Sequence, residues 1–273
     1  LLAGRALTKF LHPFTCEELD QDFSFQKALT YGMLPEVWDG DDANNYLKSY
    51  VTTYLKEEVQ QEGLTRNLGN FSRFLEVASL SQASLLNVSN IAREVGVDNK
   101  TAENYFTILE DLLLAVRLPI FSKHAKREMY QRSKFLFFDV GVYRTIRPKG
   151  PLDTAELIDG AALETLLFQQ IRALNEYYDF GYNLYHWKTR SQEEVDFVLY
   201  GEKGLIAIEV NRTASPRKKE LKGLREFLSD YPIAKAILLY GGNKRQYIDN
   251  IELIPFEEGL FSLKNLLEET TKN

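Results

Sequence analysis

Cysteine and histidine are scarce in the 273-residue sequence, which has Cys16 alone and three histidines. A single cysteine excludes an internal disulfide framework and a zinc site built from paired cysteines. No apolar run approaches the roughly 18 to 20 residues of a membrane-spanning helix. The first residues lack the basic start, apolar core and cleavage site of a signal peptide. We expect a cytoplasmic protein with no membrane partner, in which Cys16 is a small core or surface residue.

A phosphate-binding loop of the GxxxxGK[ST] type is also missing, and the stretch YGGNKRQ lacks its spacing and its strand-to-helix context. ATP is therefore not expected to bind to such a loop in this chain. The opening LLAGRAL begins in mid-pattern. It predicts that the chain is a fragment of a longer polypeptide, with removal of an initiator or a tag as the alternative.

Apolar residues make up 44% of the chain and charged residues 26%, which is typical of a soluble globular protein. The length suits two modules or one larger domain with an appendage. The net charge is −6, but residues 120–150 contain eight lysines and arginines against Glu128 and Asp139. Such a local basic patch attracts phosphate even on an acidic protein; a solvated surface is the alternative interpretation.

The first part of the chain is expected to be helical over residues 23–65. One helix should end at Gly32, with Pro35 soon after it, and a long amphipathic helix is expected over 41–63. A further helix is predicted over 68–80.

A helix-turn-helix is predicted within residues 87–118. The first helix should end at Gly96, and Asp98 or Asn99 should cap the second. Two strands around a basic loop follow, as in the wing of a winged helix. The exposed positions of the second helix are mostly acidic, so any nucleic-acid contact should come from the wing, through Lys123, Lys126, Arg127 and Arg132. A packing role is the alternative.

Two prolines and a glycine within residues 147–156 predict a domain boundary. After it we expect helices over 156–177, 216–229 and 259–269, and strands over 183–187, 194–200, 205–211, 234–240 and 251–254. The sequence thus predicts an α/β (α+β) fold in three parts. These are a linker and helical segment (1–66), a winged helix (67–147), and a mixed sheet flanked by helices (148–273).

The stretch EEVDFVLYGEKGLIAIEVN, residues 193–211, reads as a hairpin that carries acids inside apolar strands. If residues 201–204 form the loop, Tyr200 pairs with Leu205 and Asp196 lies opposite Glu209. Cross-strand partners have Cβ atoms about 4.5–5.5 Å apart, so two carboxylates there repel unless a cation such as Mg²⁺ lies between them. The alternative is a solvated face, or ion pairs with Lys188 or Arg190.

The hairpin resembles the core of the PD-(D/E)XK nuclease-like fold, in which acids bind a divalent metal and a lysine assists cleavage of a phosphodiester. With YGMLPEV, YVTTYLKEEV, IAREVGVDNKTAENYFTILED, KFLFFDVGVYR and GAALETLLFQQI, nearly the whole chain resembles the C-terminal region of archaeal and bacterial AAA+-type ATPases. That region is a domain of unknown function with a winged helix. The resemblance implies that ATP binds only in an ATPase core missing from this chain.

Position by position, the resemblance places the nuclease acids at Glu164, Asp196 and Glu209, with Asp196 and Glu209 as metal ligands. The lysine position falls on Asn211. An amide cannot supply the positive charge, and losing such a group commonly costs about 10²–10³ in rate. Four lysines could replace it: Lys188, Lys218, Lys219 and Lys222.

Three functions follow from these expectations. The first is a non-enzymatic C-terminal module of an AAA+-type ATPase that binds DNA or a partner protein, with a degenerate nuclease-like part. The second is an active, divalent-metal-dependent nuclease with a relocated lysine. The third is a structural domain through which the ATPase core of the same polypeptide assembles, as in a homo-oligomer.

Overall fold

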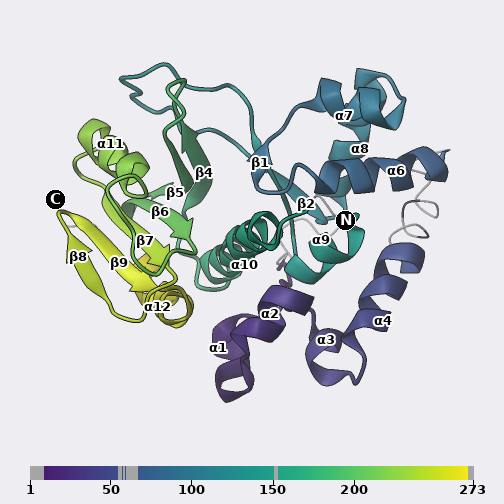
Figure 1. The fold of residues 1–273 in the computed structure, drawn as a ribbon, viewed down its shortest axis with the longest axis horizontal. Helices are drawn as coiled ribbons and strands as arrows, with labels where there is room; N and C mark the ends of the chain where they lie inside the picture. The colour runs from purple at the N-terminus through teal and green to yellow at the C-terminus, as the bar shows by residue number, and fades with distance from the viewer. Residues whose placement is uncertain (1–8, 55–56, 58, 60–66, 151–152, 270–273) are drawn as a thin grey trace, which may run out of the picture.

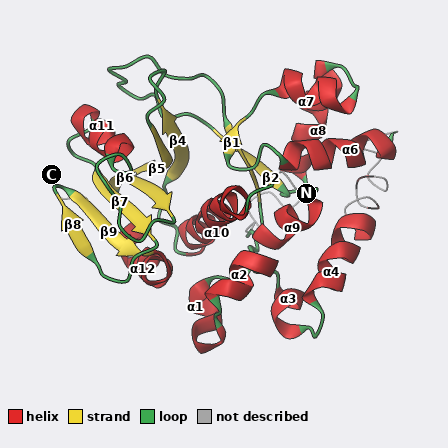
Figure 2. Ribbon diagram, in the orientation of Figure 1, coloured by secondary structure: helices red, strands yellow, loops and turns green. Residues whose placement is uncertain are grey.

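The computed structural model of the chain describes residues 9–54, 57, 59, 67–150 and 153–269. Its elements form a helical N-terminal part, a winged helix, and a mixed six-stranded sheet covered by helices (Figures 1 and 2). The α/β fold class predicted from the sequence is confirmed. No helix within the described ranges is both long enough and apolar enough to cross a membrane.

The N-terminal part consists of short helices that pack around the winged helix. Thr30 and Tyr31 complete a helix that ends at Gly32, as the sequence predicts. The long helix expected over 41–63 is interrupted: its first segment stops at Ser49 and a π-helical turn follows, while residues 55–56, 58 and 60–66 lie outside the description. Thr52 donates a hydrogen bond back to the Lys48 carbonyl, a local bond that distorts helices. The elements are α1 (Cys16–Leu19), η1 (Asp20–Asp22), α2 (Phe25–Tyr31), α3 (Pro35–Asp39), α4 (Ala43–Ser49) and η2 (Tyr50–Tyr54).

The winged helix combines four helices with a small antiparallel sheet of order β1-β3-β2. Gly96 ends α7 in the left-handed conformation, with φ +82°, and the Asp98 side chain accepts a hydrogen bond from the Thr101 amide to cap α8. Both features agree with the sequence prediction. The elements are α6 (Leu68–Ser79), β1 (Ser84–Leu85), α7 (Val88–Val95), α8 (Asn99–Asp111), β2 (Ala115–Leu118), β3 (Lys134–Phe137) and α9 (Val140–Ile146).

The wing loop, residues 119–133, does not project from the winged helix but lies along the large sheet. Ile120 forms an isolated bridge with His186 of the edge strand β4 (Asn183–Lys188), and Met129 forms one with Thr189, the residue after that strand. Phe121 is buried against aromatic side chains of α11 and its C-terminal cap. The expected loop between two strands is present, but it is docked on the sheet.

The large sheet has the order β4-β5-β6-β7-β9-β8, with β6, β7 and β9 parallel. Helix α11 begins later than the sequence suggested, because the Glu220 carboxylate accepts a hydrogen bond from the Arg217 amide in a turn before it. Strand β8 was not anticipated. The elements are α10 (Ala155–Tyr177), β4 (Asn183–Lys188), β5 (Glu194–Gly201), β6 (Gly204–Asn211), α11 (Lys222–Asp230), β7 (Lys235–Tyr240), β8 (Gln246–Ile248), β9 (Ile251–Pro255) and α12 (Phe256–Glu268).

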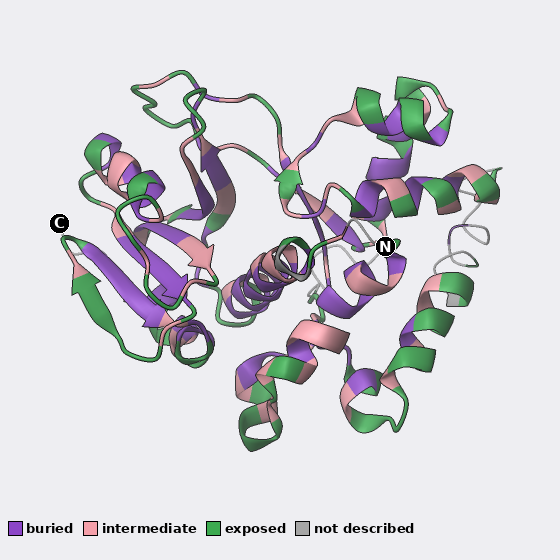
Figure 3. Ribbon diagram, viewed as in Figure 1, coloured by how far each residue is buried: buried purple, intermediate pink, exposed green. Residues whose placement is uncertain are grey.

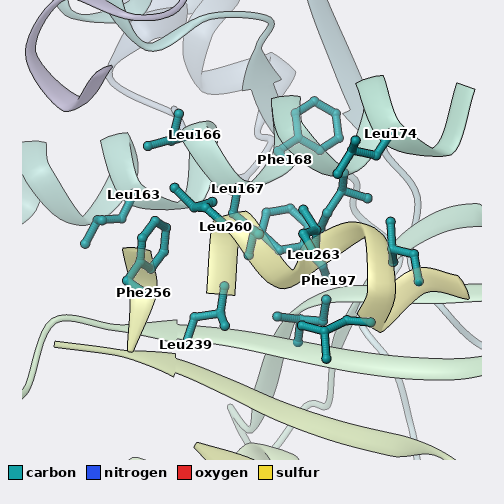
Figure 4. Close-up of a cluster of buried hydrophobic side chains, with 14 of the residues drawn as sticks. Leu163, Leu166, Leu167, Phe168, Leu174, Phe197, Leu239, Phe256, Leu260 and Leu263 are labelled. Carbon is teal, nitrogen blue, oxygen red and sulfur yellow. The ribbon is translucent and has the colours of Figure 1, made fainter. Parts of the chain in front are cut away.

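Helix α10 lies at the centre of the molecule, between the winged helix and the sheet, and its buried side faces a layer shared with α12 (Figures 1 and 3). Leucines of α10 and α12 meet Phe197 and Leu239 of the sheet in this layer (Figure 4). Leu118, Leu136 and Val140 of the winged helix belong to the same apolar cluster. The opposite face of the sheet packs against α11. The winged helix has an apolar cluster of its own around Phe71, Phe106 and Phe135, and through the three residues named above it also joins the core of the sheet.

Candidate functional site

A buried lysine brings the winged helix to the acids of the sheet. The Nζ atom of Lys134, the first residue of β3, lies 2.6 Å from Glu164 Oε2 and 2.8 Å from Asp196 Oδ1. The Lys134 side chain is only 5% exposed. Burial alone lowers the pKa of Lys134, but the charges of Asp196 and Glu164 outweigh it, so the pKa lies above its ordinary value. The lysine is therefore an ammonium ion held by two carboxyl groups.

Asp196 lies at a bulge of β5. On β4, Tyr185 pairs with Val198 and Trp187 pairs with Val195, so β5 carries one extra residue between these pairs. The second oxygen of Asp196, Oδ2, accepts a hydrogen bond of 3.0 Å from the Val210 amide of β6. Both oxygens of this carboxylate thus have partners: Lys134 of β3 for Oδ1 and Val210 of β6 for Oδ2.

The hairpin register agrees with the sequence prediction over most of its length. Tyr200 pairs with Leu205, and the same register continues to Phe197 and Ile208. Two details differ from expectation. Gly201 pairs with Gly204, which leaves a two-residue turn, and the ladder ends one pair before Asp196 and Glu209. The ladder pairing of these two acids is therefore not formed, although Asp196 Oδ2 accepts a hydrogen bond from the next residue on β6, Val210.

Glu164 projects from α10 toward Lys134 and Asp196. Burial raises its pKa to about 8, with Asp196 adding to the rise and Lys134 opposing it. At neutral pH the carboxyl group of Glu164 therefore tends to keep its proton. The cluster then holds one ammonium ion, one carboxylate and one protonated acid.

Glu209 approaches from the α11 side of the sheet. A Cβ atom on Gly223 of α11 would lie 3.2 Å from its Oε2 atom. That oxygen is buried and has no hydrogen-bond partner within the described part of the chain. Burial raises the pKa of Glu209 well above its ordinary value, and the charges of Asp196 and Glu194 add to the rise. An unpartnered acid at this place costs folding stability.

Asn211, at the position of the nuclease lysine, is not joined to this cluster by any hydrogen bond of the described residues. Its Oδ1 accepts a hydrogen bond of 2.9 Å from the Thr213 amide. Among the lysines proposed as replacements, Lys188 pairs with Glu194 and Lys222 pairs with Glu193. Lys218 and Lys219 precede α11 and are exposed. The lysine that reaches the acids is Lys134, which sequence reasoning counted only within the basic patch.

A cleft of about 290 Å³ opens beside Lys134, and we call it the β3–β4 cleft. His186 closes one wall: its Nε2 atom lies 3.0 Å from the Arg132 carbonyl, which requires Nε2 to donate the proton. Burial, with Lys134, lowers the pKa of His186 to about 4, so the imidazole is neutral. The cleft is lined by Ala83, Ser84, Leu85, Tyr130, Arg132, Lys134, His186, Trp187, Lys188, Gln192, Glu194 and Val195.

Of the four basic residues expected to contact nucleic acid, two contact other side chains of the protein and two are exposed. Arg127 pairs with Glu226 and Asp230 of α11, at 2.8 Å in each case. The Lys123 ammonium lies over the Tyr200 ring, 4.6 Å from its centroid. Lys126 and Arg132 are exposed, and Arg132 lines the β3–β4 cleft.

The sequence predicts that Asp196 and Glu209 hold a magnesium ion. In the structure Asp196 Oδ1 accepts a hydrogen bond from Lys134 Nζ, and Asp196 Oδ2 accepts one from the Val210 amide, so both oxygens of this predicted ligand are already engaged. In the described ranges, no group of three or more histidine, cysteine, aspartate or glutamate side chains is placed to hold a metal ion. A metal would first have to displace the ammonium group.

Glu209→Gln is expected to raise the free energy of unfolding by about 1–2 kcal/mol at pH 8, because a neutral amide replaces an acid whose burial disfavours ionisation. The folded-state pKa of Glu209 is raised above its ordinary value of 4.5. Stability of the unaltered protein is therefore lost as the pH rises above that value, and the gain from glutamine grows with pH. Urea denaturation at pH 5 and pH 8 measures this difference. Glu202→Gln in the exposed turn is the control, and an equal effect there would contradict the expectation.

Two family profiles match the chain. Residues 22–153 match a domain of unknown function, DUF8612, and residues 159–258 match a second, DUF4143. The chain is also similar to uncharacterised proteins of Mycobacterium tuberculosis and Mycobacterium bovis, each 24% identical over 264 residues. These alignments cover 94% of this chain and 58% of each relative, so the chain spans less than two thirds of their length. No solved structure matches the chain.

Proposed function

We propose that the chain is the C-terminal module of an AAA+-type ATPase, that it binds nucleic acid in the β3–β4 cleft, and that its nuclease-like part does not catalyse cleavage. The observation that carries the proposal is the cleft itself, which is lined by the exposed Arg132 beside Lys134 and Lys188, two lysines that are paired with acids. A basic groove can follow a phosphate backbone, and here Arg132 is the residue that would contact it.

The surface of the winged helix supports the cleft rather than α8 as the binding site. The exposed side of α8 carries Glu103, which with Glu110 pairs with Arg117 of β2 at 2.7 and 2.6 Å. An acidic helix repels a polyanion. The exposed cations Lys126 and Arg132 lie instead on the wing loop.

The arrangement of the acids supports a non-catalytic role. Asn211 supplies no charge, and Lys134 takes the place of a metal between Glu164 and Asp196. The ATPase part of the proposal rests on the resemblance of the motifs. The matching mycobacterial proteins are longer than the region aligned to this chain, which leaves room in them for a further domain.

Arg132→Ala with Lys126→Ala is expected to weaken binding to single-stranded and duplex DNA similarly across sequences. It should reduce the slope of log affinity against log salt by about 0.7–0.9 for each phosphate that the protein no longer neutralises. Fluorescence anisotropy over a salt series measures the slope. Lys100→Ala, an exposed lysine of α8, is the matched control. Absence of binding at low salt would contradict the proposal and favour a structural or oligomerisation role, tested by the mass of the particle in solution.

A second function is favoured by one observation: the Lys134 ammonium lies at the acids and supplies a positive charge that Asn211 lacks. Lys134 would then be the relocated lysine of an active nuclease. Incubation with plasmid and single-stranded DNA in Mg²⁺ or Mn²⁺ distinguishes the two functions. Metal-dependent cutting that disappears in Asp196→Asn, with the variant still folded, would replace the non-catalytic proposal by this one.

A further inference from the structure

We propose that Lys134 is the resident cation of the carboxyl groups of Glu164 and Asp196, in the place of a divalent metal, and that it binds the winged helix to the sheet. The inference does not depend on nucleic-acid binding. The proposal assigns to Lys134, a residue of the winged helix, the role of holding Glu164 and Asp196 together when no metal is bound.

The geometry meets the needs of both sides of the contact. Lys134 Nζ donates to Glu164 Oε2 at 2.6 Å and to Asp196 Oδ1 at 2.8 Å. A lysine ammonium has three donors and no acceptor, so two carboxyl groups use two of them. The third side of the ammonium faces the Phe197 ring, 5.6 Å from its centroid.

Burial makes this pairing obligatory. The side chains of Lys134, Asp196 and Glu164 are 5%, 7% and 20% exposed. A buried charge without a partner is unfavourable, whereas an ammonium ion that is neutralised by the Asp196 carboxylate and also donates to the Glu164 carboxyl group is tolerated. Because the lysine side chain is part of the protein, it fills the site without the loss of freedom that a metal ion from solution would incur.

Displacement of Lys134 is opposed by the strand that carries it. Lys134 pairs with Leu85 of β1 on one side and with Leu118 of β2 on the other. Leu118 and Leu136 pack in the core shared with α10. A divalent ion would have to expel a side chain anchored at the middle strand of the small sheet, so metal binding and the seating of β3 on the large sheet are mutually exclusive.

The experiment compares Mn²⁺ binding to the unaltered protein and to Lys134→Ala. Binding is measured by the loss of the paramagnetic resonance signal of free Mn²⁺ and by the change in the Tm of the protein. The unaltered protein should show no saturable Mn²⁺ site below roughly 1 mM. Lys134→Ala leaves two facing carboxyl groups and room for an ion. It should gain one site that raises Tm by about 2–4 °C, and this gain should be lost in Lys134→Ala with Asp196→Asn.

Lys149→Ala, an exposed lysine in the same basic stretch, is the control and should gain no site. If Lys134→Ala does not fold without metal, refolding in the presence of Mn²⁺ but not in EDTA supports the proposal. A saturable Mn²⁺ site in the unaltered protein that Asp196→Asn removes would overturn it. Failure of Lys134→Ala to gain a site, whether folded or refolded, would overturn it as well. DNA affinity, measured separately, decides the proposed function and leaves this result unchanged.

Discussion

Lys134→Met is expected to lower the free energy of unfolding by about 3–5 kcal/mol at pH 8, because removal of one partner leaves buried charges uncompensated. Methionine fills similar space but donates no hydrogen bond. Glu164 and Asp196 therefore lose the Lys134 ammonium group, whose Nζ atom lies 2.6 and 2.8 Å from their carboxyl oxygens. The two carboxyl groups then face each other across an apolar side chain. This is the larger of the two strongest effects predicted for the chain.

The effect of Lys134→Met should depend on pH in a defined direction. The pKa of Glu164 in the folded protein is raised from 4.5 to about 8. Between these values the folded state keeps a proton that the unfolded state has lost, so stability falls as the pH rises, by up to about 1.4 kcal/mol per pH unit for one proton. Without Lys134, which opposes the rise, the folded-state pKa of Glu164 increases further. Both folded states keep this proton up to about pH 7, so the stabilities of the variant and the unaltered protein should fall in parallel to that point and diverge further as the pH reaches 8.

Urea denaturation at pH 5, 6.5 and 8 measures both predictions. Lys149→Met is the matched control and should lie within about 0.5 kcal/mol of the unaltered protein. Adding Glu164→Gln to Lys134→Met should restore part of the lost stability at pH 8. A loss below about 1 kcal/mol at pH 8, or a loss independent of pH, would contradict a buried ion pair at this place.

Asp139→Ala is expected to cost about 2–4 kcal/mol, the sum of a lost helix cap and an unsatisfied buried amide. The fully buried Asp139 accepts hydrogen bonds from the Val142 amide, which caps α9, and from the Met33 amide of the N-terminal part. One carboxylate therefore joins two segments far apart in the sequence. Gly32 lies against it with φ +78°, where an added Cβ would be 2.2 Å from Asp139 Oδ1.

Asp98→Ala is the matched control for Asp139→Ala. Asp98 also caps a helix, but it is exposed and bonds only to its own turn, so its loss should cost about 1 kcal/mol. Denaturant titration of the two variants separates the local cap from the long-range bond. Equal losses in both would show that the bond to Met33 contributes nothing. Asp139→Asn, which keeps one acceptor, should lie between alanine and the unaltered protein.

The parts of the fold that sequence could predict are those fixed by neighbours along the chain. Gly96 and Asp98 mark the turn between α7 and α8, because a left-handed glycine and a capping side chain act within one turn. The glycines at 201 and 204 placed the hairpin and the pairing of Tyr200 with Leu205. Strand β8 was missed because it is a short, half-exposed edge strand without the expected alternation.

The candidate site was predictable only in part, because its contacts join residues that are far apart along the chain. Glu164, Asp196 and Glu209 stood out as acids within apolar elements. The partner of the first two is 30 residues from Glu164 and 62 residues from Asp196, and no local spacing encodes such a contact. The one available signal was a lysine that opens the buried strand KFLF. The bulge at Asp196 depends on the partner strand β4, so the hairpin alone could not reveal it.

The docked wing loop has a mechanical consequence. Ile120 bridges to β4, Met129 bridges to the residue after that strand, and Arg127 is tied to α11, so the loop fastens one half of the molecule to the other along its length. A torque applied to the small sheet would reach the large one directly, without bending at a hinge between them. We expect the small sheet, the wing loop and the large sheet to move as one unit.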